Sequence, residues 1–418
     1  MRSSPAIALV CALCATSVLV AGQLPRLAED SAIAYSKTAA TDPVARLQKK
    51  IDSGELTLTF DEQHGYLSSL LRALEIPVSS QGLVFSRTSL QVDRIAPWSP
   101  RAVYFNDDVY VGWVQGGPIM EIAATDPKLG AVFYTLDQEQ RDRPVIRREG
   151  RTCLQCHDSA STGGVPGFIM RSVVTDRYGY PVAAGASATT DQTKLEDRWG
   201  GWYVTGTMGN LRHKGNAMVP LLAHEIGNVE SYLARNPVAA AGDITSLAGR
   251  FDSDPYLTPH SDAVALLVLA HQSEVHNLIT RAGYEAARAL AVNDNMTAVE
   301  TVAERLVRAL LFVNAAPLTA PVAGTSSFAK EFASEGPRDR RGRSLRELDL
   351  KTRLFRYPLS YLIYSDGFDA LPPVVKSYVS RRLHEVASGS ETRREFSQLS
   401  SDDRQAILEI LEDTKPGF

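Results

Sequence analysis

The sequence predicts an α+β fold in which a strand-rich first part is followed by a mainly helical second part. Short stretches of alternating apolar and polar residues, separated by turn residues, recur between Ser86 and Asp137, and this pattern is typical of hairpin sheets. From about Pro220 the apolar residues recur instead at helical spacing. The 418 residues suffice for two domains, or for one large domain with insertions.

Residues 1–22 are predicted to be a secretory signal peptide. Arg2 precedes an apolar run from Ala6 to Ala21 that ends in small residues and is too short to span a bilayer comfortably. An uncleaved anchor helix is the alternative interpretation. We therefore expect a periplasmic protein that is not an integral membrane protein once the signal is removed. Its mature chain would keep two cysteines, Cys153 and Cys156.

Residues 23–55 look like a polar, loosely structured lead-in, and residues 56–218 form the predicted strand-rich region. A helix-like run, Gly65–Leu74, precedes the strands. The strands are expected at Ala102–Phe105, Val109–Val114, Ile119–Ala124 and Ala131–Leu136, followed by a strand pair at Phe168–Thr175 and Tyr180–Ala186.

Residues 219–418 form the predicted helical region. Thr258 as N-cap and Pro259 as first helical residue predict the start of a helix that runs to about Leu290. Further helices are expected at Ala298–Asn314, Pro373–Val386 and Ser401–Leu411. The arginine-rich loop Ser334–Arg346 is either a solvated linker or a docking patch for an acidic partner.

The stretch Cys153-Leu154-Gln155-Cys156-His157 has the spacing at which haem c is attached covalently. The two thiols would form thioethers with the haem vinyl groups, and His157 would bind the iron from one face. The alternative interpretations of this motif are half of a zinc site and a redox dithiol. Zinc would need two more ligands, and no second cysteine pair remains in the mature chain. A redox dithiol would want a strand before the motif, where the polar run Arg147–Arg151 stands instead. We therefore predict one covalent haem c.

The sixth iron ligand decides what such a haem can do. A methionine favours electron transfer, a histidine lowers the potential, and an open position permits small-ligand chemistry. Met208 lies about fifty residues beyond His157 in a glycine-flanked loop, and His213 belongs to the same loop. Met208 is the predicted ligand, with His213 or an open position as alternatives.

Three further groups of residues could complete the site. Four cations could pair with the haem propionates or remain solvated, namely Arg171, Arg198, Arg212 and Lys214. Three aromatic residues could cover a haem face or pack in the core, namely Trp113, Phe133 and Tyr134. His271 and His276 could bind a second metal, although such histidines are more often hydrogen-bonded core residues.

The motif behind an export signal resembles the c-type cytochrome superfamily. Through Tyr104–Trp113 and Trp199–Gly206, the chain is also similar to a group of large bacterial exported monohaem cytochrome-domain proteins. This resemblance implies one haem held by Cys153, Cys156 and His157, and it implies no catalytic residue. Small cytochrome c domains have a helix ahead of the motif, where a sheet is expected here. The fold is therefore predicted to differ from the simple small cytochrome c fold.

Three functions are compatible with these features. The first is a periplasmic c-type cytochrome that exchanges electrons with a periplasmic redox partner protein. The second is a haem enzyme of peroxidase or small-molecule oxidoreductase type, because a carrier needs only about a hundred residues. His271, His276 or Tyr284 would then line its distal pocket. The third is a haem-based sensor. The net charge of -4 does not indicate a nucleic-acid partner.

Overall fold

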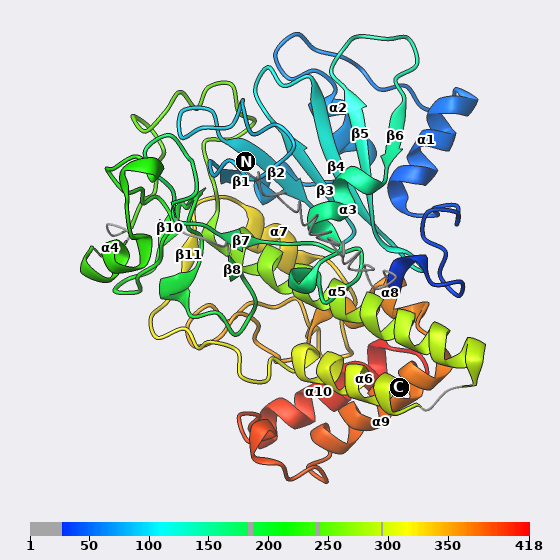
Figure 1. Ribbon diagram of the computed structural model, residues 1–418. Helices are drawn as coiled ribbons and strands as arrows, with labels where there is room; N and C mark the ends of the chain where they lie inside the picture. The colour runs from blue at the N-terminus through cyan, green and yellow to red at the C-terminus, as the bar shows by residue number, and fades with distance from the viewer. Residues whose placement is uncertain (1–26, 183–186, 237, 239–242, 294–295) are drawn as a thin grey trace, which may run out of the picture.

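The computed structural model describes residues 27–182, 187–236, 238, 243–293 and 296–418. The predicted signal peptide, residues 1–22, lies outside the described residues. The N-terminal half contains a seven-stranded antiparallel sheet and the C-terminal half is helical, as Figure 1 shows. The predicted α+β class is therefore confirmed.

The central sheet has the strand order β6-β5-β4-β3-β2-β1-β9. Its strands are β1 (Gly82–Val84), β2 (Arg101–Phe105), β3 (Val109–Trp113), β4 (Ile119–Asp126), β5 (Gly130–Asp137), β6 (Ile146–Glu149) and β9 (Trp202–Tyr203). The four strands predicted between Ala102 and Leu136 are β2 to β5. The turn between β2 and β3 forms because the Asn106 side-chain oxygen accepts the backbone N–H groups of Asp108 and Val109.

The segment predicted as an unstructured lead-in contains a helix, α1 (Pro43–Ser53). Asp42 caps it by accepting the N–H groups of Val44 and Ala45, and the buried residues of α1 pack beside the sheet. The prediction overlooked an N-cap followed by proline, which marks a helix start. The helix-like run before the strands is α2 (Leu67–Ala73).

The predicted strand pair after the motif is much shorter than expected. Strands β7 (Arg171–Ser172) and β8 (Ser187–Ala188) pair over two residues each, and residues 183–186 lie outside the described part of the chain. The turn between the predicted strands does form, because the Gly179 N–H donates to the Asp176 carbonyl at 3.0 Å.

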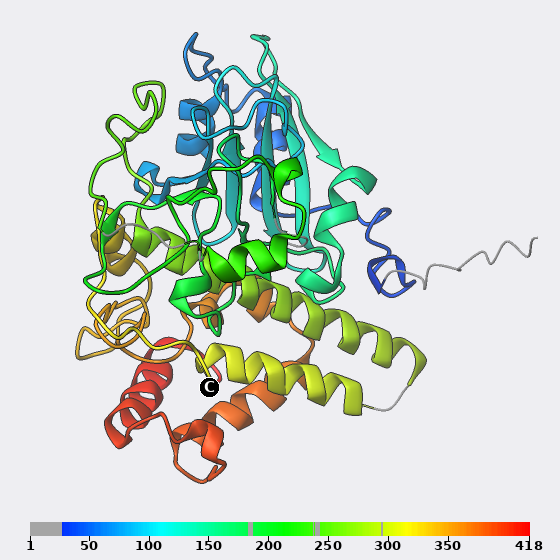
Figure 2. The ribbon, with the colours of Figure 1, turned by 60° about the vertical axis from the view of Figure 1, so that its left-hand side comes forward.

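The longest helix, α5 (Ala263–Val292), lies between the sheet and the helices α6 (Thr297–Leu310), α9 (Pro373–Ala387) and α10 (Ser401–Thr414) in Figures 1 and 2. It begins after Asp262 rather than after Thr258. The Asp262 carboxylate accepts the N–H groups of Val264 and Ala265, and it also accepts those of Thr325 and Ser326 from a distant loop. This tertiary contact decides which of the two candidate caps starts the helix.

The predicted C-terminal helices are present as α6 (Thr297–Leu310), α9 (Pro373–Ala387) and α10 (Ser401–Thr414). Shorter elements are α4 (Val229–Arg235), α7 (Phe328–Ser334), α8 (Asp366–Asp369), β10 (Gly206–Thr207) and β11 (Ala323–Gly324). The described residues between 219 and 262 include one α-helix, α4, so the helical region starts later than predicted. Within the described residues, no helix combines the length and apolar character that crossing a membrane requires.

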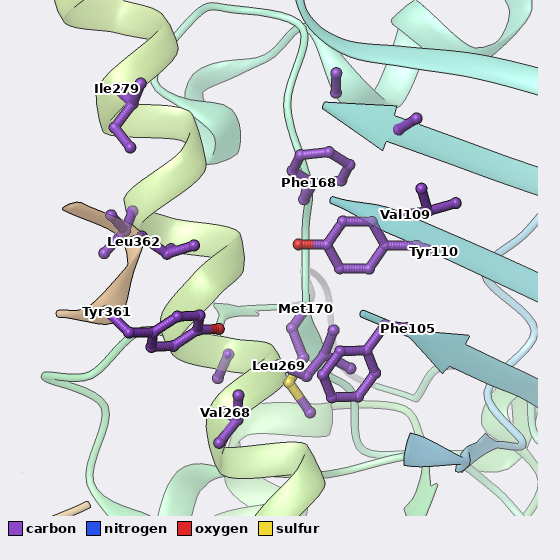
Figure 3. Packing of buried hydrophobic residues seen from close by; sticks show 14 of the residues in the cluster. Phe105, Val109, Tyr110, Phe168, Met170, Val268, Leu269, Ile279, Tyr361 and Leu362 are labelled. Carbon is purple, nitrogen blue, oxygen red and sulfur yellow. The ribbon is translucent and has the colours of Figure 1, made fainter. Parts of the chain in front are cut away.

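Side chains on one face of the sheet point towards α5. Phe105, Tyr110, Ala123 and Phe133 share this face because they are paired across neighbouring strands. Figure 3 shows Phe105 and Tyr110 directed at α5, with Phe168 and Met170 between the strands and the helix. The space between this face and α5 is therefore where the chain after the motif runs.

His276 on α5 should make the stability of the protein depend on pH. The side chain is buried, and its Nε2–H donates to the Asp107 carbonyl at 2.8 Å. Burial lowers the pKa of His276 from 6.5 to about 4, although the bond to Asp107 opposes this shift. The unfolded chain therefore binds a proton that the folded chain does not, and the stability present above pH 6.5 is lost as the pH falls towards 4.

We expect His276→Gln to lose less stability than the wild type between pH 7 and pH 4. The free energy of unfolding that the wild type loses over this pH range should exceed the loss of the variant by up to about 3 kcal/mol, at 1.36 kcal/mol per pKa unit. Urea unfolding at several pH values measures it, and His224→Gln on the exposed surface is the control. Parallel stability curves for His276→Gln and the wild type would contradict the prediction.

Candidate functional site

The Cys-x-x-Cys-His motif forms a short helix, α3 (Arg151–His157), directly after the edge strand β6. Cys156 lies three residues after Cys153 and His157 lies four residues after Cys153, so the three side chains lie on one face of α3. All three line a single cavity of about 310 Å³ between α3, the sheet and α5. Both cysteines are free thiols.

His157 is held in an orientation that suits a metal ligand. Its Nδ1–H donates to the Gly167 carbonyl at 2.9 Å, and its ring lies 4.7 Å from the Phe133 ring. Metal-binding histidines commonly donate their second ring nitrogen to a carbonyl in this way, which leaves Nε2 as the ligand atom. Burial lowers the pKa of His157; the bond to Gly167 opposes the shift and the charges of Arg101 and Arg171 add to it. The imidazole is therefore neutral at pH 7, as metal binding requires.

The segment after the motif is clamped to α5 by Asn277. The Phe168 N–H donates to the Asn277 side-chain oxygen and the Asn277 amide donates to the Phe168 carbonyl, both at 2.8 Å. Gly167 also donates its N–H to the His157 carbonyl at 2.9 Å. A Cβ atom at Gly167 would lie 2.3 Å from the Asn277 oxygen, so this close approach requires glycine.

Gly167→Ala should therefore destabilise the protein by about 2 kcal/mol, because the added methyl group forces Asn277 and its two hydrogen bonds apart. Urea unfolding measures the loss. Gly227→Ala is the matched control, because an added Cβ there would meet nothing within 4 Å. Equal stability of both variants would show that the clamp yields without cost.

The floor of the cavity is the sheet face below α3. Gly112 and Ala123 leave room above the middle of this face, which Val103, Tyr110 and Phe133 flank. Arg101 and Glu121 of the same face also line the cavity, as does Trp202 of β9. Leu269 and Ser273 of α5 form part of the wall.

Two arginines stand at the cavity. Arg101 donates to Glu121 at 2.6 Å, while its Nε is buried without a hydrogen-bond partner among the described residues. Arg171 lines the same cavity, as the sequence allowed. Arg198 instead donates to the carbonyls of Asp191 and Thr193. Arg101 is therefore already paired with a carboxylate, and Arg171, which makes no ion pair with a described residue, could bind a further carboxylate inside the cavity.

The Cys153 thiol does not resemble a reactive thiol of a redox dithiol. Burial raises the pKa of Cys153 to about 12, with further contributions from the negative charges of Glu149 and Glu121 and from Cys156. Reactive dithiols instead have a lowered thiol pKa. Among the described residues, no group of three or more His, Cys, Asp or Glu side chains could hold a metal ion. The raised pKa of Cys153 weighs against a redox dithiol, but the strand that such a dithiol wants before it is present as β6, where the sequence predicted only the polar run Arg147–Arg151.

Met208, the sixth ligand predicted from the sequence, does not line the cavity that Cys153, Cys156 and His157 line. The strand before it is bonded to the start of α5, where Thr205 exchanges backbone hydrogen bonds with Ser261 and Ala263. The motif is clamped at Asn277, 14 residues further along α5, which is about 21 Å at 1.5 Å per residue. His213 packs against Trp199, away from the motif. Spacing along the chain could not show this separation.

Met170 is the methionine that lines the cavity together with His157. It is buried, and Figure 3 shows it beside Leu269 of α5. Sequence reasoning missed Met170, Asn277 and Arg101. The run of glycines before Phe168 is a signal for a close backbone approach, whereas nothing local to Asn277 marks its role.

The aromatic candidates divide between the two faces of the sheet. Phe133 lines the cavity and contacts His157. The Tyr134 hydroxyl donates to Asp42 beside α1, and Trp113 packs against Tyr256. The alternation of side chains along a strand explains why neighbours such as Phe133 and Tyr134 take different roles.

His271 belongs to a buried hydrogen-bonded chain rather than to the cavity. Its Nδ1 lies 2.6 Å from an Asp191 oxygen and its Nε2 lies 2.7 Å from the Ser360 hydroxyl. The order Ser-His-Asp is that of a hydrolytic triad, but Ser360 and His271 are 0% exposed, so no substrate can reach the hydroxyl. His276 bonds to Asp107 and Tyr284 bonds to the Leu129 carbonyl. The distal pocket predicted from these residues is therefore not formed.

The arginine-rich loop is occupied by ion pairs. Arg340 pairs with Asp413 at 2.9 Å, and Arg341 pairs with Glu409 at 3.0 Å. Arg346 is buried and pairs with Asp107 and Glu335. These charges are neutralised within the chain, so the loop is a poor docking patch for an acidic partner.

No family model, no curated protein and no solved structure matches this chain. Its assignment therefore depends on the geometry of the site.

Proposed function

We propose that this protein is a periplasmic c-type cytochrome that carries one haem on α3 and transfers electrons. The observation that supports this most strongly is the shared face of α3. Cys153, Cys156 and His157 point together into one cavity, and Gly167 orients the imidazole so that Nε2 is available. Haem c is attached outside the cytoplasmic membrane, which agrees with the export signal expected from the sequence.

The residues of the cavity suit a covalently bound haem. The thiols of Cys153 and Cys156 would each add to a vinyl group, with sulfur bonding to one carbon and the thiol hydrogen passing to the other. Arg171 would bind a propionate, and the sheet floor would cover one face of the ring. The haem iron supplies a one-electron redox centre when bound. The volume of about 310 Å³ lies at the lower end of the range of cofactor pockets.

Electron transfer is favoured over a haem enzyme by the composition of the cavity wall. The side chains that the enzyme hypothesis places in a distal pocket are hydrogen-bonded outside the cavity, namely His271, His276 and Tyr284. The cavity itself is lined by Met170 and Leu269. A thioether ligand suits a six-coordinate iron that exchanges electrons without binding a substrate. We therefore propose Met170 as the sixth ligand.

The absorption spectrum of the purified protein tests this function. We expect a low-spin, six-coordinate haem in both redox states that does not change when carbon monoxide or cyanide is added. Chemical treatment that leaves thioethers intact should not extract the haem. A high-spin iron that binds carbon monoxide at once would overturn the carrier function in favour of an enzyme or sensor. Absence of haem from protein made with a haem c attachment system would overturn the proposal altogether.

A further inference from the structure

An exposed aromatic surface lies next to the rim of the cavity. Five large apolar side chains are solvent-exposed on two segments, residues 90–98 and 178–180, and Trp98 among them is 54% exposed. They are Leu90, Val92, Trp98, Tyr178 and Tyr180. These five side chains and Arg87 make up the aromatic patch. Exposed apolar residues that gather in this way commonly mark an interaction site.

The aromatic patch is preformed. Arg87 donates to the Tyr178 carbonyl and to the Tyr180 hydroxyl, both at 3.0 Å, and its guanidinium lies 4.3 Å from the centre of the Tyr180 ring. The rings of Trp98 and Tyr178 meet edge to face at 5.9 Å. Gly179 has a φ of +85°, and a Cβ there would lie 2.5 Å from the Phe85 carbonyl oxygen. Such a surface loses little conformational freedom when a partner binds.

The aromatic patch is continuous with the proposed haem site. Ser86, Thr88, Ser89 and Leu90 line the cavity that α3 also lines, and Leu90 belongs to both the cavity and the patch. A protein seated on the patch would therefore approach the cavity from its rim. Electron exchange between proteins requires such a close approach, because tunnelling weakens steeply with distance.

The charge around the aromatic patch is positive, although the whole chain carries a net charge of -4. No ion pair with a described residue neutralises the three arginines at the patch, which are Arg87, Arg94 and Arg177. Arg94 donates to the Gly116 carbonyl, and the Arg177 guanidinium lies over the Tyr178 ring. Asp176 is buried, and its carboxylate accepts the N–H groups of residues 178 and 180. Within residues 90–98 and 178–180, the exposed acidic side chain is that of Asp93. An acidic partner would complement this surface.

We propose that the aromatic patch is the docking surface on which an acidic redox protein exchanges electrons with the haem. This inference rests on the proposed function, because it requires a haem on α3. In the exchange, one electron passes from the reduced partner to the ferric iron, and no bond is formed or broken.

Reduction by an acidic flavodoxin tests the docking surface. The flavodoxin hydroquinone gives one electron to the ferric haem and becomes the semiquinone, and stopped-flow absorbance follows the reaction. The second-order rate constant should fall at least about tenfold when salt is raised from about 20 mM to about 500 mM, because salt screens the attraction. The double variant Arg94→Glu/Arg177→Glu should lose about tenfold in rate at low salt. Trp98→Ala should slow the reaction at both salt concentrations.

Two controls make the test specific. Arg305→Glu and Arg394→Glu together make the same charge change at exposed sites in the C-terminal helical part, and this variant should react within about twofold of wild type at low salt. A small neutral hydroquinone should reduce all haem-loaded variants equally, because it needs no docking surface.

The docking surface is wrong if Arg94→Glu/Arg177→Glu reacts as fast as wild type with the same salt dependence. It is also wrong if Trp98→Ala converts a dimer to a monomer in sedimentation, since the patch would then bind a second copy of the chain. The haem spectrum of each variant, recorded first, separates these outcomes from failure of the proposed function. A protein without haem would overturn both proposals.

Discussion

The double variant Cys153→Ser/Cys156→Ser is expected to contain no covalent haem. A serine hydroxyl does not add to a vinyl group under the conditions at which a thiol does, so both thioethers are lost. The helix should still form, because its packing against the sheet depends on the buried Leu154 rather than on the thiols. Haem staining after denaturing electrophoresis should therefore show a complete loss, while the far-ultraviolet circular dichroism stays close to that of the wild type.

Gln155→Ala is the matched control for the cysteine variants. Gln155 lies between the two thiols on α3 and also lines the cavity, but it has no group that could form a thioether. This variant should retain its full haem content. Each single cysteine variant should keep one thioether, with the reduced spectrum shifted to longer wavelength by the remaining vinyl group. Undiminished covalent haem in the double variant would contradict the assignment of both cysteines.

Met170→Ala should convert the iron from low spin to high spin and open it to carbon monoxide. The physical reason is the loss of the thioether that the fold places in the cavity with His157. The charge-transfer band of methionine-bound ferric haem should disappear. Because the deleted side chain is also buried, the protein should lose about 2 to 5 kcal/mol of stability. Absorption spectra and urea unfolding measure the two effects separately.

Met208→Ala is the control for the Met170 variant. Met208 is also buried, so its removal should cost similar stability and leave the iron spectrum unchanged. The opposite result, with the band lost in Met208→Ala and kept in Met170→Ala, would restore the ligand first predicted from the spacing. An unchanged spectrum in both variants would remove methionine from the sixth position.

Local patterns were sufficient where neighbouring residues carry the information. Alternating side chains located β2 to β5, and the turn at Asn106 followed from a side chain that bonds to its own backbone. The Asp42-Pro43 start of α1 was also present in the sequence, and the prediction passed over it. The start of α5 depended on more than local preference, because Asp262 also binds a loop more than sixty residues away.

The sequence by itself determined the shared face of the Cys153–His157 motif, because the spacing of the two thiols and the imidazole places them on one side of a helix. Only the tertiary structure decided what surrounds that face. Asn277 reaches the motif's loop from 109 residues away. Met170 lines the cavity of the motif, whereas Met208 does not, and its N–H donates to Asp243 instead. Long-range contacts of this kind depend on how the sheet and α5 pack, and the spacing of residues along the chain does not encode them.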